Sequence, residues 1–389
     1  MNEWSRLKLT QAGTLERGRS RYRPRYASHL YGGPYPFIQT GQIKAASKYI
    51  RSFEQTYSEA GLAQSRLWPK GTLCITIAAN IAEIAILDID ACFPDSVLGF
   101  RPNTDICDLD FVFYTLKRFQ RELQVFGDGS VQDNINLETF EQIDFPFPPL
   151  PEQRAIAGVL SSLDDKIDLL HRQNKTLEAM AEALWRKMFV EEADPGWKRG
   201  RLGDLGEIVC GKTSPKNTPE YFGGGIPFIK IPDMHGKVFI LETEDSLTEA
   251  GKQSQANKTI PARSICVSCI ATVGLVSMNP VEAQTNQQIN TIVPRPEYLR
   301  YFVFLLMRNM TDDLLSRASG GTATDNLNTG DFSRIEVLVP PEDVMRRFDR
   351  LVKGIFESVH ANSKQVLTLS RMRDSLLPKL MSGEVRVKL

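Results

Sequence analysis

The chain has 389 residues, 42 % of them hydrophobic, which is long enough for two or three domains with packed cores. Its formal net charge is zero, which argues against a nucleic-acid binder that ignores sequence but not against a site-specific one. No run of about 18 apolar residues could span a membrane, the N-terminus has no apolar signal core, and six dispersed cysteines do not indicate a disulfide scaffold, so we expect a cytoplasmic protein.

Arginine dominates the first 26 residues. The stretch "RGRSRYRPRY" places Arg19, Arg21 and Arg23 beside Tyr22 and Tyr26, a composition suited to DNA phosphates and base faces. A solvated N-terminal arm is an equally good interpretation of this charge.

Mixed α and β elements follow. "TLCITIA" at residues 72–78 is rich in β-branched residues and predicts a strand, and "DFVFYTLKRFQRELQVF" at 110–126 predicts a largely buried helix. The proline run "FPFPPLPEQ" then ends this first half. Pro151 fits the first turn of a helix, where its missing N–H costs nothing, and Glu152 suits the helix N-terminus.

Residues 148–192 are predicted to form one long helix, which "ADPG" at 193–196 ends. Its apolar positions alternate at spacings of four and three, the pattern of a coiled-coil seam. The seam consists of Ile156, Leu160, Leu163, Ile167, Leu170, Asn174, Leu177, Ala181, Leu184 and Met188.

The second half repeats the first at a spacing of about 192 residues, which indicates a duplicated unit. "GGPYPFIQT" at 32 matches "GGGIPFIKI" at 223, "YSEAG" at 57 matches "LTEAG" at 247, and "GSVQDNINLETFEQI" at 129 matches "GTATDNLNTGDFSRI" at 321. "SICVSCIATVGLVSM" predicts strands and "RYFVFLLMRNMTDDLLS" at 300–316 predicts a buried helix.

A second long helix is predicted over residues 340–389, with Gly383 near its end and Pro378 as a candidate kink. The same phase gives a second seam: Phe348, Val352, Ile355, Val359, Asn362, Val366, Leu369, Arg373, Leu376 and Leu380.

The two seams fit each other when the helices run antiparallel. Asn174 then faces Asn362, so each buried amide has a polar partner, and only Arg373, opposite Leu163, is awkward; we expect it to extend towards solvent. A parallel pairing would leave Asn174 against Val366 with its amide unpaired. Two unrelated amphipathic helices on separate cores are the alternative.

The predicted fold is therefore mixed α/β. Two similar α+β domains, residues 1–147 and 193–339, are separated by two long helices, residues 148–192 and 340–389, that form an antiparallel coiled coil with approximate two-fold symmetry. Each seam runs about 33 residues, or roughly 50 Å, which corresponds to roughly 15 base pairs of B-DNA. Two-fold proteins commonly bind DNA half-sites on one face, and because these two domains differ in sequence their half-sites should differ.

Three segments resemble the specificity subunit of type I restriction-modification systems. "PLPEQRAIAGVLSSLDDKI" is similar to its central conserved region, "PGWKRGRLGDLGEIVCGKT" with "GGGIPFIKIPDM" to the start of its second target-recognition domain, and "SLLPKLMSGEVRV" to its C-terminal end. The resemblance covers the whole chain, although the opening of the first domain departs most from the pattern.

The resemblance implies a DNA-recognition subunit that has no catalysis and no cofactor of its own. Each target-recognition domain would bind one half of a bipartite, asymmetric DNA target, and the helices would set the spacer. Two modification subunits that methylate adenine would dock on the helices, and restriction subunits would complete the cleaving complex. S-adenosylmethionine, ATP and Mg would belong to these partners.

The chemistry of the sequence agrees with such a role. It contains neither a G-x-x-x-x-G-K-[ST] loop nor an N-P-P-Y or D-P-P-Y motif, and its four histidines are scattered. Cys266 and Cys269 form a lone C-x-x-C in a strand-like run without two further zinc ligands, so we expect core residues there and no metal site.

We expect DNA contacts from side chains that favour bases and phosphates, at matched positions of the repeat. For each one, a solvated surface position is the competing interpretation. The candidates are Arg19, Arg21, Arg23, Gln39 and Lys44 in the first domain and Lys212, Lys216, Lys230, Asn286, Gln287 and Gln288 in the second.

Trp185 and Phe189 lie beside the first seam and are large for a solvated helix face. They are either an exposed protein-binding surface or residues packed against the second domain. Two rival functions stay open at this point: a scaffold with two ligand-binding domains on a coiled-coil clamp, and a nuclease, which would need an acidic metal cluster that the sequence lacks.

Overall fold

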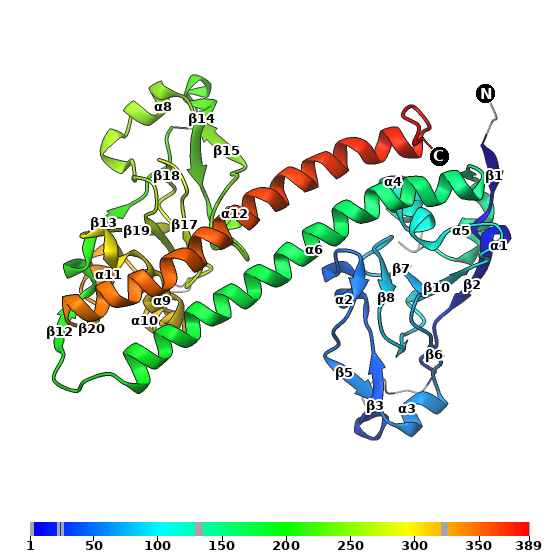
Figure 1. The fold of residues 1–389 in the computed structure, drawn as a ribbon, viewed down its shortest axis with the longest axis horizontal. Helices are drawn as coiled ribbons and strands as arrows, with labels where there is room; N and C mark the ends of the chain where they lie inside the picture. The colour runs from blue at the N-terminus through cyan, green and yellow to red at the C-terminus, as the bar shows by residue number, and fades with distance from the viewer. Residues whose placement is uncertain are drawn as a thin grey trace. The chain divides into compact units, whose positions relative to one another are not determined.

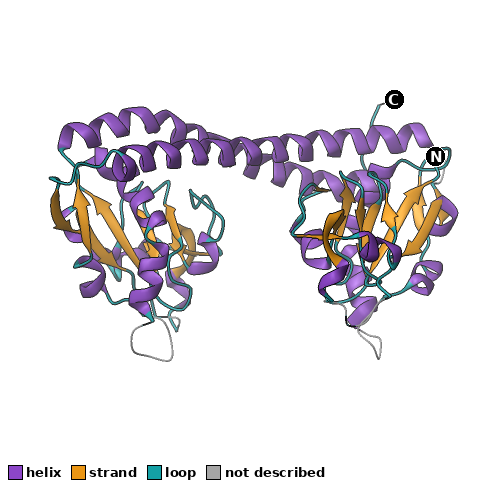
Figure 2. Cartoon of the chain, turned by 90° about the horizontal axis from the view of Figure 1, so that it is seen from below, coloured by secondary structure: helices purple, strands orange, loops and turns teal. Residues whose placement is uncertain are grey.

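The computed structural model describes residues 4–21, 24, 27–128, 135–215, 217–319 and 326–388 (Figure 1). The chain separates into two compact units, Met1–Asp168 with Leu367–Leu389, and Leu169–Val366. In each unit the strands and short helices form a mixed domain against part of the long helices, as Figure 2 shows. We call these the first and the second domain.

The first domain contains a five-stranded sheet of order β2-β10-β7-β8-β4, a four-stranded sheet of order β5-β3-β9-β6, and the antiparallel pair β1-β11. The strands are β1 (Ser5–Leu7), β2 (Gly13–Arg17), β3 (Tyr31–Phe37), β4 (Tyr49–Ile50), β5 (Gln55–Tyr57), β6 (Leu67–Trp68), β7 (Leu73–Thr76), β8 (Ile84–Leu87), β9 (Ala91–Cys92), β10 (Val97–Pro102) and β11 (Phe145–Phe147). The predicted strand at 72–78 is confirmed as β7, whose four residues are all buried.

The largest helix of the first domain, α4 (Leu109–Asp128), confirms the prediction for residues 110–126. Asp108 caps it by accepting a hydrogen bond from the backbone N–H of Phe111. Phe111, Val112 and Leu116 bury its apolar face in the same core as β7 and β10. The smaller helices are α1 (Leu9–Ala12), η1 (Ser28–Leu30), α2 (Thr40–Ala45), α3 (Glu59–Ala63) and α5 (Leu137–Gln142).

The second domain repeats this topology, with isolated bridges from Phe239 to Met278 and from Ile260 to Ala283 in place of β4 and β6. Its sheets have the orders β13-β19-β16-β17, β15-β14-β18 and β12-β20. The strands are β12 (Lys198–Arg201), β13 (Gly206–Cys210), β14 (Phe222–Ile229), β15 (Asp245–Leu247), β16 (Ile265–Ser268), β17 (Val276–Met278), β18 (Gln284–Thr285), β19 (Ile289–Pro294) and β20 (Glu336–Val339). The register of β3 on β5 shifts between Tyr31 and Tyr35, and that of β14 on β15 shifts between Phe222 and Ile226, so even the irregularity is duplicated.

One predicted helix of the second domain is broken. Residues 300–316 form α9 (Arg300–Asn309) and α10 (Thr311–Ala318), which meet at Met310. Around this joint the Asn309 amide donates to the Leu305 carbonyl, and the Thr311 hydroxyl donates to the carbonyls of Arg308 and Gly274. Side chains that bond nearby backbone compete with a continuous helix. The other helices are η3 (Leu202–Asp204), η4 (Pro219–Tyr221), α7 (Ile231–Met234), α8 (Glu249–Gln253), η5 (Ala256–Lys258), η6 (Glu297–Leu299) and α11 (Thr329–Ser333).

The two long helices are α6 (Leu150–Arg186), which continues as the π-helical turn η2 (Lys187–Glu191), and α12 (Glu342–Met381). Pro151 lies in the first turn of α6, and Gly383, with φ +74°, follows the end of α12. Pro378 lies inside α12. Neither helix is long and apolar enough to cross a membrane, nor is any other helix in the described ranges.

The predicted antiparallel register is confirmed. In the second unit the Asn362 amide donates to Asn174 Oδ1 at 3.0 Å, and the Asn174 amide donates to Ser363 Oγ at 3.2 Å. Asn362 and Ser363 therefore supply the polar partners of Asn174 within a largely apolar seam, which fixes the register of the helices.

Arg373 does not extend into solvent as expected. In the first unit its guanidinium lies 2.7 Å from a carboxylate oxygen of Asp164 on α6, and the Tyr114 hydroxyl donates to the other oxygen at 2.6 Å. A partly buried ion pair thus replaces the apolar contact at this position of the seam, because Asp164, beside Leu163, supplies a charge partner.

Candidate nucleic-acid interface

In the second domain, the predicted DNA contacts gather where neighbouring strands end. β14 and β18 are parallel partners, and Lys230 and Asn286 follow their last residues. The Asn286 N–H donates to the Ile229 carbonyl at 3.1 Å, and the Lys212 N–H donates to the Thr285 carbonyl at 2.9 Å. Three segments that are distant in sequence therefore meet at one edge of the domain.

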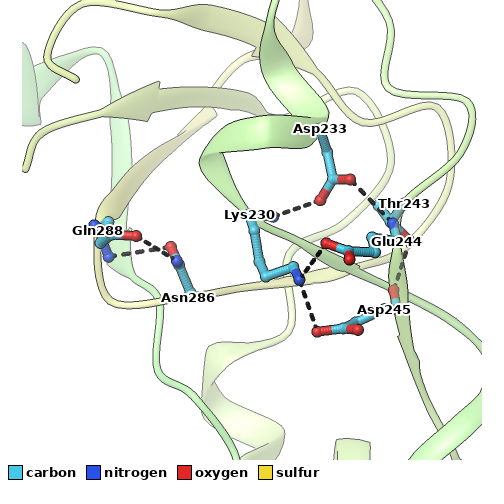
Figure 3. A network of polar contacts seen from close by, with 7 residues as sticks. All are labelled: Lys230, Asp233, Thr243, Glu244, Asp245, Asn286 and Gln288. Atoms are coloured by element: carbon cyan, nitrogen blue, oxygen red, sulfur yellow. Dashed lines mark hydrogen bonds and ion pairs between the residues drawn. The ribbon is translucent and has the colours of Figure 1, made fainter. Parts of the chain in front are cut away.

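Lys230 is held by two carboxylates (Figure 3). Its Nζ lies 2.8 Å from Glu244 and 3.0 Å from Asp245, and the hydrogen bond to Glu244 is the main reason that its pKa is raised. Asp233 fixes the backbone of both Lys230 and its partner Glu244, because the Asp233 carboxylate accepts from the Lys230 N–H at 2.8 Å and from the Glu244 N–H at 3.0 Å. The lysine is thus a charged group with a defined position and not a mobile surface cation.

The amides at 286–288 have different roles. Asn286 is 8 % exposed, its amide donates to Gln288 Oε1 at 2.8 Å, and its Oδ1 accepts from the Gln288 N–H at 3.2 Å. Asn286 therefore closes the loop, and with so little of it exposed it offers less surface for a base contact than Gln287 does. Gln287 is exposed and accepts a hydrogen bond from the Thr213 hydroxyl at 2.6 Å.

A matched pair of glycines allows these segments to approach one another. A Cβ on Gly211 would overlap the carbonyl oxygen of Asn286, and one on Gly18 would overlap the carbonyl oxygen of Pro94. Each glycine directly precedes a predicted contact, Lys212 or Arg19. Only glycine lets the backbone come this close.

The first domain has the same arrangement with different side chains. The Arg19 N–H donates to the Phe93 carbonyl at 3.2 Å, and the Ile38 N–H donates to the Cys92 carbonyl at 2.8 Å, which brings Arg19 and Gln39 to one edge. Gln39 donates through its side chain to Gln55 Oε1 at 2.7 Å.

Two further predicted DNA contacts of the first domain are exposed. Arg21 is exposed two residues after Arg19, and Lys44, exposed on α2, donates to Asn80 Oδ1 at 3.2 Å. Arg23 and Lys216 lie outside the described residues.

Sequence reasoning missed three residues of these edges, Gln55, Glu244 and Asp245. The signal was available, because the match of "YSEAG" with "LTEAG" aligns Tyr57 with Leu247 and hence Gln55 with Asp245. The register confirms this alignment, since Gln55 faces Phe37 and Asp245 faces Phe228 at equivalent ends of β3 and β14.

Trp185 and Phe189 do not form an exposed surface. They are 6 % and 7 % exposed, and the Phe189 ring packs edge-on against Phe302 and Phe348 with ring centroids 4.8 and 5.0 Å apart. The prediction of a partner-binding site there is wrong, and packing against the second domain is the correct interpretation. The exposed large apolar side chains of α6 and α12 are Leu169, Met180, Leu351 and Met372.

The cysteines of the C-x-x-C motif belong to the core. Burial raises the pKa of Cys266 to about 12 and that of Cys269 to about 11, so both thiols are protonated at neutral pH. Within the described ranges, no three His, Cys, Asp or Glu residues gather in a way that could hold a metal ion.

The fold therefore contains two related domains whose equivalent strand ends carry different polar side chains. Comparison with known proteins agrees. The family model described as the type I restriction modification DNA specificity domain matches residues 1–179 and 195–360.

Two relatives and one solved structure extend this finding. The specificity subunit of the type I restriction enzyme HindI from Haemophilus influenzae is 36 % identical over 364 residues, covering 73 % of this chain and 79 % of the relative. The MjaIX specificity subunit from Methanocaldococcus jannaschii is 25 % identical over 386 residues, covering 92 % and 88 %. The type I S subunit from M. genitalium has a similar fold, with a TM-score of 0.67 at 16 % identity over 100 % of this chain and 97 % of that one. The chain belongs to the family of type I restriction-modification DNA specificity subunits, which confirms the resemblance found in the sequence.

Proposed function

We propose that this chain is the DNA-recognition subunit of a type I restriction-modification complex that acts in the cytoplasm, and that each domain recognises one half of a bipartite, asymmetric target. The observation that carries the proposal is the pair of equivalent strand ends with different polar side chains, such as Gln39 and Lys230. Two different half-sites require domains with the same backbone arrangement but different side chains at the positions that contact bases. The proposed recognition domains are residues 1–147 and 193–339.

The long helices, residues 148–192 and 340–389, set the spacer between the half-sites and dock two modification subunits, with restriction subunits completing the assembly. Exposed apolar side chains on these helices support the docking role. In the second unit a groove of about 570 Å³ lies beside the asparagine pair. It is lined by Leu169, Arg172, Gln173, Thr176, Leu177, Ser358 and Asn362.

Catalysis is assigned to the partners. S-adenosylmethionine serves the modification subunits, and ATP and Mg serve the restriction subunits. The specificity chain contributes recognition and geometry and no cofactor of its own.

Methylome sequencing of the host with and without this gene tests the proposal. We expect one bipartite adenine-methylation motif to disappear on deletion and to return on complementation. An unchanged methylome would contradict DNA recognition and favour a scaffold role.

A domain exchange tests the division of labour. Replacing residues 1–147 by the corresponding domain of a relative should change one half-site alone, and a change in both half-sites or in neither would contradict the modular proposal. The donor should keep residues equivalent to Lys48 and Asp110, because Lys48 donates to Ser161 on α6 at 2.8 Å and pairs with Asp110 at 3.1 Å.

A further inference from the structure

The two domains hold different chemistry at one equivalent position. Gln39 follows β3 and caps α2, and its N–H donates to Gln42 Oε1 at 2.7 Å. Lys230 follows β14 and caps α7, and its N–H donates to Asp233 Oδ2 at 2.8 Å. The backbone and its local bonding are the same in both domains.

The partner across the strand is also equivalent. Gln55 begins β5 and accepts from the Gln39 amide at 2.7 Å, and Asp245 begins β15 and lies 3.0 Å from Lys230 Nζ. The neighbouring residue is a glutamate in both domains, Glu54 and Glu244. An amide pair in one domain is therefore replaced by an ion pair in the other on the same scaffold, so the fold requires neither chemistry.

These groups keep hydrogen-bonding capacity beyond the contacts within the chain. A lysine ammonium has three N–H donors, of which Glu244 and Asp245 take two, and the side chains of these carboxylates are 71 % and 44 % exposed. A glutamine amide has two N–H donors, and Gln39 gives one to Gln55.

The free capacity of the two pairs matches different base pairs. In the major groove G offers the acceptors O6 and N7 beside the N4 donor of C, which suits a cation next to a carboxylate. Adenine offers the acceptor N7 and the donor N6, which suits a glutamine amide.

We propose that this matched pair selects one base pair in each half-site: Gln39 with Gln55 selects A·T, and Lys230 with Asp245 selects G·C. The inference rests on the proposed function. It adds two specificity-determining residues: Gln55, which orients Gln39, and Asp245, which orients Lys230 and offers its carboxylate to the N4 donor of cytosine.

The test exchanges the chemistry between domains in the complete methyltransferase complex. Lys230→Gln with Asp245→Gln gives the second domain the side chains of the first, and the methylated motif is then determined by methylome sequencing. We expect one G·C position of the second half-site to become A·T, with the first half-site unchanged. On duplexes that differ at this position, discrimination should shift by roughly 5- to 150-fold, the range of a good bidentate contact.

A control variant and a reciprocal variant complete the design. Arg295→Gln with Glu207→Gln removes an exposed ion pair of 2.8 Å from the same domain and should leave the motif unchanged. Gln39→Lys with Gln55→Asp should change one A·T position of the first half-site to G·C.

The outcomes separate this inference from the proposed function. If the exchange variants methylate the original motif, the inference is wrong, whereas the proposed function still stands if deletion of the gene removes that motif. If the second-domain variant methylates nothing, the motif of the reciprocal variant is the test: a change from A·T to G·C in the first half-site supports the inference, and the original motif contradicts it. Loss of all methylation by both variants would also overturn the inference, because residues that only select bases leave some duplex recognised.

Discussion

At the scale of single residues, the ion pair of Arg373 with Asp164 is the main exception to the apolar seam. Asp164 is only 10 % exposed, and it accepts bonds from both Arg373 and Tyr114. A partly buried carboxylate needs such partners. Removing the cation alone leaves an unpaired buried charge, which destabilises the fold more than replacing both members of the ion pair by apolar residues.

We therefore expect Arg373→Leu to lower the free energy of unfolding by about 1–3 kcal/mol. The triple variant with Asp164→Leu and Tyr114→Phe should recover most of this loss, because an apolar pair fits the seam and no buried hydroxyl is left without a partner. Urea unfolding of both variants measures the difference, and equal stabilities of the single and triple variants would contradict the argument.

His360 on α12 provides a pH dependence in the second unit. Burial lowers the pKa of its imidazole, with a further contribution from Arg263, whose guanidinium lies 3.3 Å from Nδ1, and from Lys364. The ring also packs on Phe239 at 4.8 Å. The folded state therefore favours the neutral imidazole of His360.

Because the folded-state pKa lies below the value of about 6.5 for an unfolded histidine, the unfolded chain binds more protons as the pH falls through this range. Stability is then complete above pH of about 7 and decreases on acidification. We expect His360→Gln to flatten this part of the dependence of the free energy of unfolding on pH, measured by urea unfolding at several pH values. His171→Gln, at an exposed position of α6, is the control. An unchanged slope in His360→Gln would contradict the assignment.

At the scale of elements, the strand-end loops depend on close backbone contact. Gly211 passes against the carbonyl of Asn286, whereas Gly225 in β14 faces open space. The two glycines therefore form a matched pair for substitution.

Gly211→Ala should displace the segment that carries Lys212 and weaken DNA binding by the complex at least tenfold, roughly 1.4 kcal/mol, with the loss in the second half-site. Gly225→Ala should bind as the parent does. Fluorescence anisotropy with target duplexes gives the comparison, and equal affinities of the two variants would show that the close approach is dispensable.

The sequence predicts the helices and strands of this molecule better than the hydrogen-bond partners of the polar side chains at the strand ends. The asparagine in each seam determined the register of α6 and α12 because a buried amide has few acceptable partners. The break at Met310 was not predictable, since it depends on hydrogen bonds from Asn309 and Thr311, and the latter reaches Gly274, which is remote in sequence. The partners of Lys230 and the burial of Asn286 likewise depend on how separate loops meet, which periodicity does not encode.

At the scale of the whole molecule, both long helices are shared between the two units. The first unit takes residues up to Asp168 and again from Leu367, whereas the second is the continuous segment Leu169–Val366. The core of the first unit includes Leu380 and Met381, which pack with Phe111, Ile156 and Leu160.

Deleting residues 367–389 should therefore loosen the first domain and leave the second largely intact. Each buried leucine or methionine that is removed costs about 2–5 kcal/mol. Hydrogen exchange measured by mass spectrometry should show faster exchange in β7 and α4 and unchanged exchange in β16 and α9. Uniform loss of protection in both domains would contradict this prediction.

The same division has a consequence for synthesis on the ribosome. The chain emerges from its N-terminus, so the domain made first lacks Leu380 and Met381, which belong to its core, until the whole of the second unit has been made. The domain made second has all of its residues by Val366. We therefore expect the second domain to complete its core before the first, whose core is complete only after the last turns of α12 have been made.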